Sequence, residues 1–189
     1  MREVIKLGLI LLVITSVAAF VLGVTNEMTS SIIEERLHRE NVEAIKSILP
    51  IAEEFNPIEG EGITDKELIV EVYEGIKDDE VVGYTVKTNP NGYSGTVEVL
   101  VGFSVDGEIV GVKIGQHTET PGLGSKIADS AYIGQFFNKA VDLGFSTTKD
   151  VPATDNDIQA ITGATVSSDA VVDGINAAGS LFEEVLRNR

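Results

Sequence analysis

The sequence predicts an α+β protein, in which an N-terminal transmembrane helix precedes one domain built from an antiparallel sheet flanked by helices. Three observations support this class: an uncharged apolar run near the N-terminus, a central block of β-branched segments separated by turn residues, and a closing amphipathic segment. A chain of 189 residues has room for an anchor, a connecting segment and one domain with a sizeable core.

The first element is an apolar run from Leu7 to Val24 without charged residues, which at about 1.5 Å rise per residue nearly spans a hydrocarbon core of roughly 30 Å. A cleaved signal peptide is the alternative, because Arg2 and Lys6 precede the run and "SVAAF" offers small residues for cleavage. The run exceeds the usual apolar signal region of about 7–15 residues, which favours a retained anchor. We therefore expect a single-pass protein of the cytoplasmic (inner) membrane, with basic residues inside and the soluble domain on the extracytoplasmic side.

A second helix is expected from Ser31 to Leu49, where apolar residues recur with helical spacing. Ser31 and Glu34 match a capping box, Pro50 ends the pattern, and the loop "NPIEGEGITD" follows. The expected segments are 1–28 as cytoplasmic tip and anchor, 29–60 as connecting helix and loop, and 61–189 as the extracytoplasmic domain.

Four β-branched segments follow, namely "ELIVEVYEG", "EVVGYTVKT", "GTVEVLVGFSV" and "EIVGVKIG". The stretches "KDDE", "NPNG" and "DGE" supply turns between them, so the simplest arrangement is an antiparallel meander. Beyond the strands, "HTETPGLGSKIAD" is expected to be a loop, "SAYIGQFFNKAVD" helical turns and "STTKDVPATDND" a polar loop. The closing segment from Val166 to Arg187 predicts a helix with one buried stripe, made of Ala170, Val171, Ile175, Ala178, Leu181, Phe182 and Val185.

Composition excludes several functions. The formal net charge of -16 argues against nucleic-acid binding, which needs a basic face. The chain has no cysteine, which excludes disulfides, thiolate-held zinc and cysteine-held iron–sulfur clusters, and with two histidines a histidine-rich metal site is not expected. Redox chemistry in this chain would need an organic cofactor.

The segment "QAITGATVSSDAVVDGINAAG" gathers hydroxyl groups where the closing helix begins. Thr165 could simply cap that helix, since a threonine at this place satisfies a free N–H group. One cap needs one hydroxyl, however, and a helix N-terminus also favours phosphate. A phosphate on Thr165 would have nearby hydroxyl donors and small residues that allow close approach; these neighbours are Thr162, Gly163, Ala164, Ser167 and Ser168.

The stretch "TGATVSS" resembles the flavinylation motif [S/T]-G-A-[T/S] of FMN-binding domains in the G subunit of the Rnf electron-transport complex and the C subunit of the Na+-translocating NADH:quinone reductase. The block "NPNGYSGTVEVLVGFSVDGEIVGVKIGQHTETPGLGSKI" is similar to the family's central block, and the short chain favours the Rnf type. The resemblance implies that Thr165 carries FMN through a phosphoester installed by a flavin transferase. One departure is Gln159, which stands where the family usually has aspartate; Asp157 lies two residues earlier.

The stretch "ETPGLG" has a physical interpretation of its own, because Pro121 stiffens the backbone while its glycines permit close approach of a ring. A plain strand-to-helix turn is the alternative. The resemblance implies that Thr120, Leu123 and Gly124 line the flavin site, with Glu119 near the polar edge of the ring, where a carboxylate would tune the flavin.

Three further side chains lie close to these motifs in the sequence. Tyr93 in "GYSG" could border or stack on the flavin, or merely pack beside the turn. His117 and Lys126 are expected to be structural or surface residues rather than catalysts.

The resemblance implies an FMN-carrying electron-transfer subunit of a membrane oxidoreductase that couples redox chemistry to ion translocation. It would be an electron carrier with no catalytic acid or base and no metal, and its partners would be integral-membrane subunits and the flavin transferase. Two alternatives stay open at this point: a membrane-tethered, non-redox binding module in which Thr165 only caps a helix, and a stand-alone FMN-dependent reductase.

Overall fold

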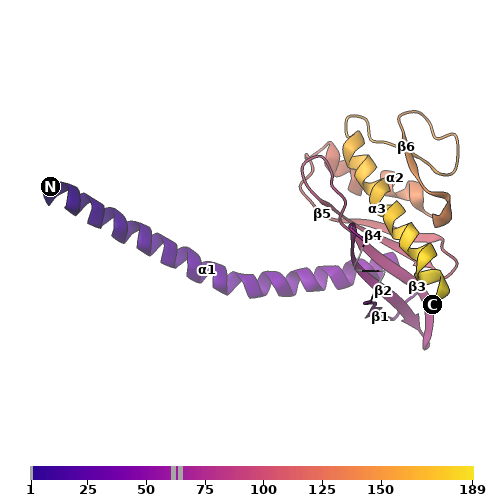
Figure 1. Ribbon diagram of the computed structural model, residues 1–189, viewed down its shortest axis with the longest axis horizontal. Helices are drawn as coiled ribbons and strands as arrows, with labels where there is room; N and C mark the ends of the chain where they lie inside the picture. The colour runs from indigo at the N-terminus through magenta and orange to yellow at the C-terminus, as the bar shows by residue number, and fades with distance from the viewer. Residues whose placement is uncertain (1, 61–62, 64–65) are drawn as a thin grey trace. The chain divides into compact units, whose positions relative to one another are not determined.

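The computed structural model describes residues 2–60, 63 and 66–189 and divides the chain into two compact units, Met1–Val42 and Glu43–Arg189. The predicted α+β class is confirmed: an apolar N-terminal helix is followed by a domain with an antiparallel sheet and helices. Figure 1 labels these elements along the chain.

Helix α1 runs without interruption from Arg2 to Ile48, so the prediction of a separate helix beginning at Ser31 is wrong. The side chains of the predicted capping box lie outside the described residues, but the backbone is helical well before Ser31. No glycine or proline stands between Gly23 and Pro50 to interrupt the helix. Its part Arg2–Glu27 contains an 18-residue window with a mean hydropathy of 2.7 and no buried residue, so it is long and apolar enough to cross a membrane.

The described part of the domain contains a five-stranded sheet in which every neighbouring pair is antiparallel, in the order β1-β2-β3-β4-β5. The predicted meander is thus confirmed, and a short edge strand is added to it. The strands are β1 (Glu54–Pro57), β2 (Ile69–Lys77), β3 (Glu80–Thr88), β4 (Val97–Ser104) and β5 (Ile109–His117).

Between the sheet and the last helix, the helical turns predicted for residues 130–142 are present, but a further helical turn lies at Gly124–Ala128 where a loop was expected, and a two-stranded parallel pair lies where a polar loop was expected. These elements are η1 (Gly124–Ala128), α2 (Ser130–Ile133), η2 (Gly134–Phe136), η3 (Val141–Leu143), β6 (Ser146–Thr148) and β7 (Asp157–Gln159). The chain closes with α3 (Thr165–Glu184) and η4 (Leu186–Asn188).

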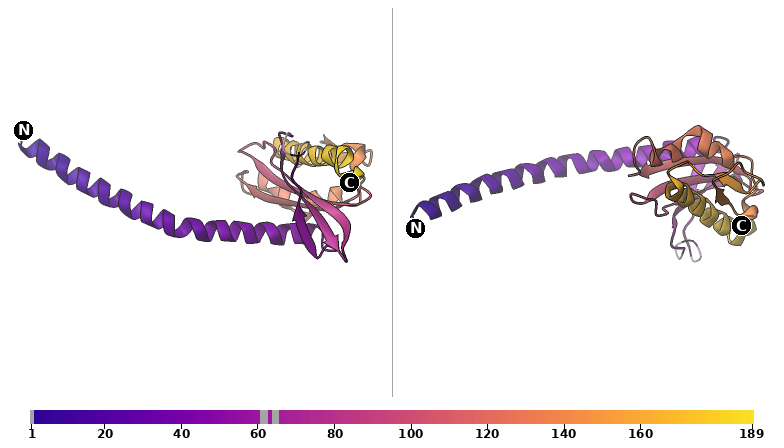
Figure 2. Two further views of the ribbon diagram at one scale, coloured as in Figure 1. Left: turned by 60° about the horizontal axis from the view of Figure 1, so that its bottom comes forward. Right: turned by 90° about the horizontal axis from the view of Figure 1, so that it is seen from above.

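Helix α3 packs along one face of the sheet, as Figures 1 and 2 both show, and the main core lies between them. Phe182 from α3 meets Phe103 of β4 at a ring-centroid distance of 5.4 Å and Tyr84 of β3 at 6.0 Å. On the opposite face, the end of α1 contributes Ile45 and Ile48 to a smaller buried cluster, which explains why β4 is buried on both faces. This packing fixes the first turn of α3 beside the segment that follows β5.

Candidate functional site

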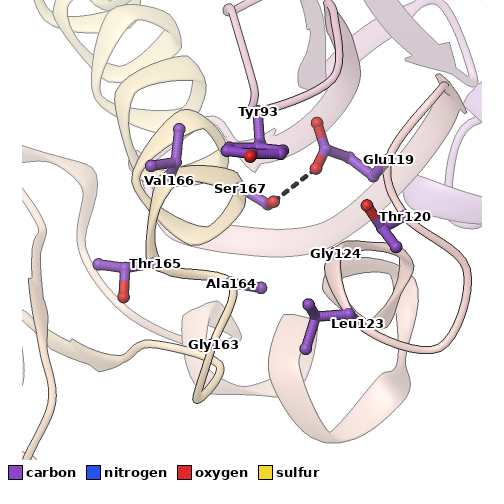
Figure 3. Close-up of a pocket in the computed structure, with 10 residues that line it drawn as sticks. All are labelled: Tyr93, Glu119, Thr120, Leu123, Gly124, Gly163, Ala164, Thr165, Val166 and Ser167. Carbon is purple, nitrogen blue, oxygen red and sulfur yellow. Dashed lines mark hydrogen bonds between the residues drawn. The ribbon is translucent and has the colours of Figure 1, made fainter.

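A cavity of about 530 Å³ lies where the first turn of α3 meets the turn before β4 and the segment after β5 (Figure 3). Cavities of roughly 300–1,000 Å³ suit small molecules and cofactors. Its lining residues are Tyr93, Glu119, Thr120, Leu123, Gly124, Gly163, Ala164, Thr165, Val166 and Ser167. The structure therefore brings together nine of the eleven side chains that the sequence singled out.

Glu119 is the buried charge of this cavity, with 4% of its surface exposed. Its Oε1 accepts a 3.0 Å hydrogen bond from the N–H of Ser94, and its Oε2 accepts a 2.6 Å hydrogen bond from the hydroxyl of Ser167. Burial raises the pKa of the carboxyl, but Ser167, the N–H groups of Ser94 and Tyr93, and nearby His117 together hold that pKa below its ordinary value. The carboxylate is thus ionised at neutral pH and held from two sides.

The carboxylate of Glu119 occupies space that is free only because Gly92 and Gly124 have no side chain. A Cβ atom on Gly124 would lie 2.6 Å from Oε2 of Glu119 and 3.0 Å from Oγ of Ser167. A Cβ atom on Gly92 would collide with Oε1 of the same carboxylate. Glycine at both positions is therefore a packing requirement of the buried carboxylate.

Thr165 is the first residue of α3, and Ala164 occupies the cap position without a side-chain cap hydrogen bond. The alternative in which Thr165 caps the helix through its side chain is therefore wrong. Among the described residues, the Thr165 hydroxyl makes no hydrogen bond, and the residue is half-buried beside the cavity. In Figure 3 its hydroxyl points away from Glu119. A free hydroxyl at a helix N-terminus is suited to bear a phosphate group.

Exposed apolar side chains form the rim of the cavity. Tyr93 is 75% exposed, Val166 50% and Leu123 41%. Figure 3 shows the ring of Tyr93 on one side of the cavity and Leu123 on the other. Sequence reasoning missed Val166, because its place on the rim depends on the helical phase after Thr165.

Two predicted side chains lie outside this lining. Thr162 faces a separate surface pocket together with Lys126 and Gln159. Ser168 is fully buried, and its hydroxyl accepts a hydrogen bond from the N–H of Ile161 and donates one to the carbonyl of Ala164. The structure therefore gives Ser168 contacts within the chain rather than with the cavity.

The departure at Gln159 is also located by the structure. Its side chain is exposed, while its N–H donates a 2.8 Å hydrogen bond to Oε1 of Gln135. Asp157 lies two residues earlier, and its Oδ2 accepts hydrogen bonds from the N–H groups of Ala153 and Thr154 within its own loop. Hydrogen bonds from Thr154 and Ala153 hold the pKa of Asp157 below its ordinary value.

His117 lies near Glu119 but lines a different pocket, with Thr96, Gln116 and Thr118. Its Nδ1 is buried without a hydrogen-bond partner among the described residues. No group of three or more histidine, aspartate or glutamate side chains in the described part of the chain could hold a metal ion.

Comparisons with known proteins identify the family of the chain. A model of the FMN-binding domain family matches residues 92–180, which include the whole cavity lining. The chain is 41% identical to the G subunit of the Na+-translocating ferredoxin:NAD+ oxidoreductase complex of Acetobacterium woodii, over 97% of this chain and 94% of that one. It is 36% identical to the G subunit of the ion-translocating oxidoreductase complex of Methanosarcina acetivorans, over 94% and 93% of the two chains.

Solved structures show the same fold. NqrC of Shewanella oneidensis matches with a TM-score of 0.51 and 18% identity, covering 67% of this chain and 65% of that one. The C subunit of the Na+-translocating NADH-quinone reductase of Parabacteroides distasonis matches with a TM-score of 0.53 and 20% identity, covering 63% of each chain.

Proposed function

The chain belongs to the family of G subunits of ion-translocating oxidoreductase complexes, which contain an FMN-binding domain, and on this premise we propose that it is an electron-transfer subunit carrying FMN covalently on Thr165. The observation that carries the proposal is the free hydroxyl of Thr165 at the N-terminus of α3, beside a cavity that holds one buried carboxylate.

The residues present fit FMN. The rim formed by Tyr93, Leu123 and Val166 offers apolar surface to a flat ring system, and Glu119 offers a hydrogen-bond acceptor to its polar edge. The N-terminus of α3 favours the phosphate. Bound FMN supplies the capacity to accept and pass on electrons, while the chain supplies its position and tunes its potential.

Attachment would use Thr165 as the acceptor. Its Oγ1 forms a bond to phosphorus of a flavin dinucleotide as a P–O bond of the pyrophosphate breaks, so that a nucleoside monophosphate leaves. The hydroxyl proton passes to the transferase or to solvent. The exposed rim leaves the Thr165 end of the cavity open to a modifying enzyme.

The setting in the membrane is part of the same proposal. In this proposal Arg2–Glu27 anchors the chain, and the basic residues before its apolar run favour an orientation with the folded domain outside the cytoplasm. There the domain exchanges electrons with integral-membrane subunits of the complex. Covalent attachment suits this compartment, because a dissociable FMN would be lost from it.

Intact-mass measurement of the full chain, produced with its flavin transferase, tests this function. The wild type is expected to gain one FMN phosphoester, Thr165→Ala none, and the control Ser180→Ala, which removes a hydroxyl outside the motif and the cavity, the full adduct. Yellow, stoichiometric flavin also excludes the non-redox binding module, and a lack of turnover with small soluble acceptors excludes the stand-alone reductase.

An unmodified wild type beside an active transferase would refute the attachment. Gln159→Asp then separates two causes, because modification of this variant alone would place the failure in the recognition segment rather than in Thr165.

A further inference from the structure

The loop between β7 and α3, residues 160–164, ends directly before Thr165 at the cavity. A few hydrogen bonds determine the backbone conformation of this loop. Its entry is fixed by the parallel strand pair, where the N–H of Ala160 donates a 2.8 Å hydrogen bond to the carbonyl of Thr148. Within the loop, the N–H of Ala164 donates to the carbonyl of Ile161 at 2.9 Å, and Gly163 adopts a positive φ of 82°. The loop is thus a tight turn that ends directly at Thr165.

The hydroxyl of Ser168 joins the two ends of this turn. It accepts a 3.0 Å hydrogen bond from the N–H of Ile161 and donates a 3.0 Å hydrogen bond to the carbonyl of Ala164. The same carbonyl also accepts the N–H of Ser168 at 3.0 Å. One side chain therefore holds the first and the last peptide group of the turn against the first turn of α3.

Ser168 is itself held from the core. The hydroxyl of Tyr132 donates a 3.0 Å hydrogen bond to the carbonyl of Ser168, and both residues are buried. Burial raises the pKa of Tyr132, which keeps its hydroxyl protonated and able to donate. This chain of contacts runs from α2 through α3 to the loop, where it ends at Ile161 and at Ala164, a residue that lines the cavity.

Adjacent Ser167 has a different environment. Its hydroxyl faces the cavity and donates to Glu119, whereas that of Ser168 faces the loop. Loss of the Ser168 hydroxyl would leave the N–H of Ile161 without its hydrogen-bond acceptor. Because an unpaired, partly buried N–H is unfavourable, the backbone at Ile161 would shift until the N–H finds another acceptor. Thr165 lies four residues further along and would move with it.

We propose that Ser168 is a positioning residue for flavin attachment, which fixes the 160–164 loop so that the Thr165 hydroxyl is presented to the transferase in one orientation. The inference rests on the proposed attachment of FMN to Thr165. It assigns to Ser168 a role through Thr165 and no contact with FMN itself.

The test measures the rate of FMN transfer to the full chain in detergent, with purified transferase and flavin adenine dinucleotide, read as the mass adduct against time. Ser168→Ala is compared with Ser180→Ala, which removes a hydroxyl that donates to a carbonyl four residues earlier in the same helix at the same distance of 3.0 Å. We expect the kcat for transfer to Ser168→Ala to fall on the order of tenfold to a hundredfold, since misplacement of a reacting group by about 1 Å has effects of this size. The KM for the acceptor chain stays within about twofold, because the recognised surface is unchanged.

Circular dichroism melting confirms that each variant is folded at the assay temperature. If Ser168→Ala is not folded, Ser168→Cys, which fills the same space and hydrogen-bonds weakly, replaces it under the same criterion. A transfer rate equal to that of Ser180→Ala overturns the inference, as does a loss carried by KM alone. A wild type that takes up no FMN refutes the attachment itself, and with it this inference.

Discussion

The hydroxyl of Ser167 donates a 2.6 Å hydrogen bond to Oε2 of Glu119 and so ties the first turn of α3 to the segment that follows β5. Both residues are buried and both line the cavity. A short hydrogen bond to a charged carboxylate is stronger than one between neutral groups. This hydrogen bond therefore links two parts of the fold and also stabilises the buried negative charge of the site.

Glu119→Gln is expected to raise the reduction potential of bound FMN, by on the order of tens of millivolts. The substitution removes a buried negative charge, and a negative charge near a flavin opposes the uptake of electrons. Spectroelectrochemical titration of the FMN-loaded chain measures the shift. The control Glu108→Gln neutralises an exposed carboxylate in the turn before β5, and equal potentials in the two variants would refute a tuning role.

Glu119 also makes stability depend on pH in a defined direction. Its folded-state pKa lies below the ordinary 4.5, so the ionised carboxylate stabilises the fold above that pH. The contribution is lost as the pH falls through the folded-state pKa. The Tm difference between wild type and Glu119→Gln should therefore be largest near neutral pH and shrink below pH 4.5. A difference that stays constant across this range contradicts the assignment.

Gly124→Ala is expected to destabilise the domain by about 1–3 kcal/mol, the usual cost of overpacking, and to weaken FMN binding. Its Cβ atom would lie 2.6 Å from Oε2 of Glu119. Gly134→Ala is the matched control, because nothing lies within 4 Å of a Cβ atom there. Denaturant unfolding and flavin fluorescence measure the two effects. Equal stability of the two variants would show that the carboxylate moves aside at no cost.

The sequence predicted the central strands and α3 because their signals are long: alternating β-branched runs between turns, and one apolar stripe. It missed β1, whose four residues are mostly exposed and end in proline, and the three-residue strands β6 and β7. Strands this short depend on tertiary pairing rather than on a local pattern. The false helix start at Ser31 arose because a capping box within a continuous helix matches the same four residues.

The site was predictable as far as residue type and spacing determine it. Gly163, Ala164, Thr165 and Ser167 from the motif line one cavity together with Glu119, Thr120, Leu123 and Gly124 from the "ETPGLG" segment. The sequence did not predict that the Ser167 hydroxyl faces the cavity and the Ser168 hydroxyl faces the loop. Adjacent residues on a helix point in directions about 100° apart, and the residue at which the helix begins decides which of them faces the cavity. The sequence placed Thr165 at the cap, whereas the structure places Ala164 there.

Phe182→Ala is expected to cost about 3–5 kcal/mol of unfolding free energy. The ring is fully buried and contacts Phe103 and Tyr84 between α3 and the sheet, so its removal leaves a cavity that this packed interface cannot close. Chemical denaturation of the apo domain checks the value. Val166→Ala, in the same helix but half exposed, should change stability by less than about 1 kcal/mol; similar losses in both would contradict the assignment of the core.

The chain from Glu43 onward is expected to fold and stay soluble without residues 1–42, whereas a chain that begins at residue 61 should not. The sequence suggests 61 as the start of the domain, and the structure offers a second candidate start in the compact unit Glu43–Arg189. Residues between these two starts cover the second face of the sheet with Ile45 and Ile48 and add the edge strand β1. Without them, Leu100 and the edge of β2 become exposed, and an uncovered apolar face with a free strand edge promotes aggregation. Size-exclusion chromatography and thermal melting of the two truncated chains decide the matter, and equal solubility and Tm would mean that the end of α1 contributes nothing to the domain.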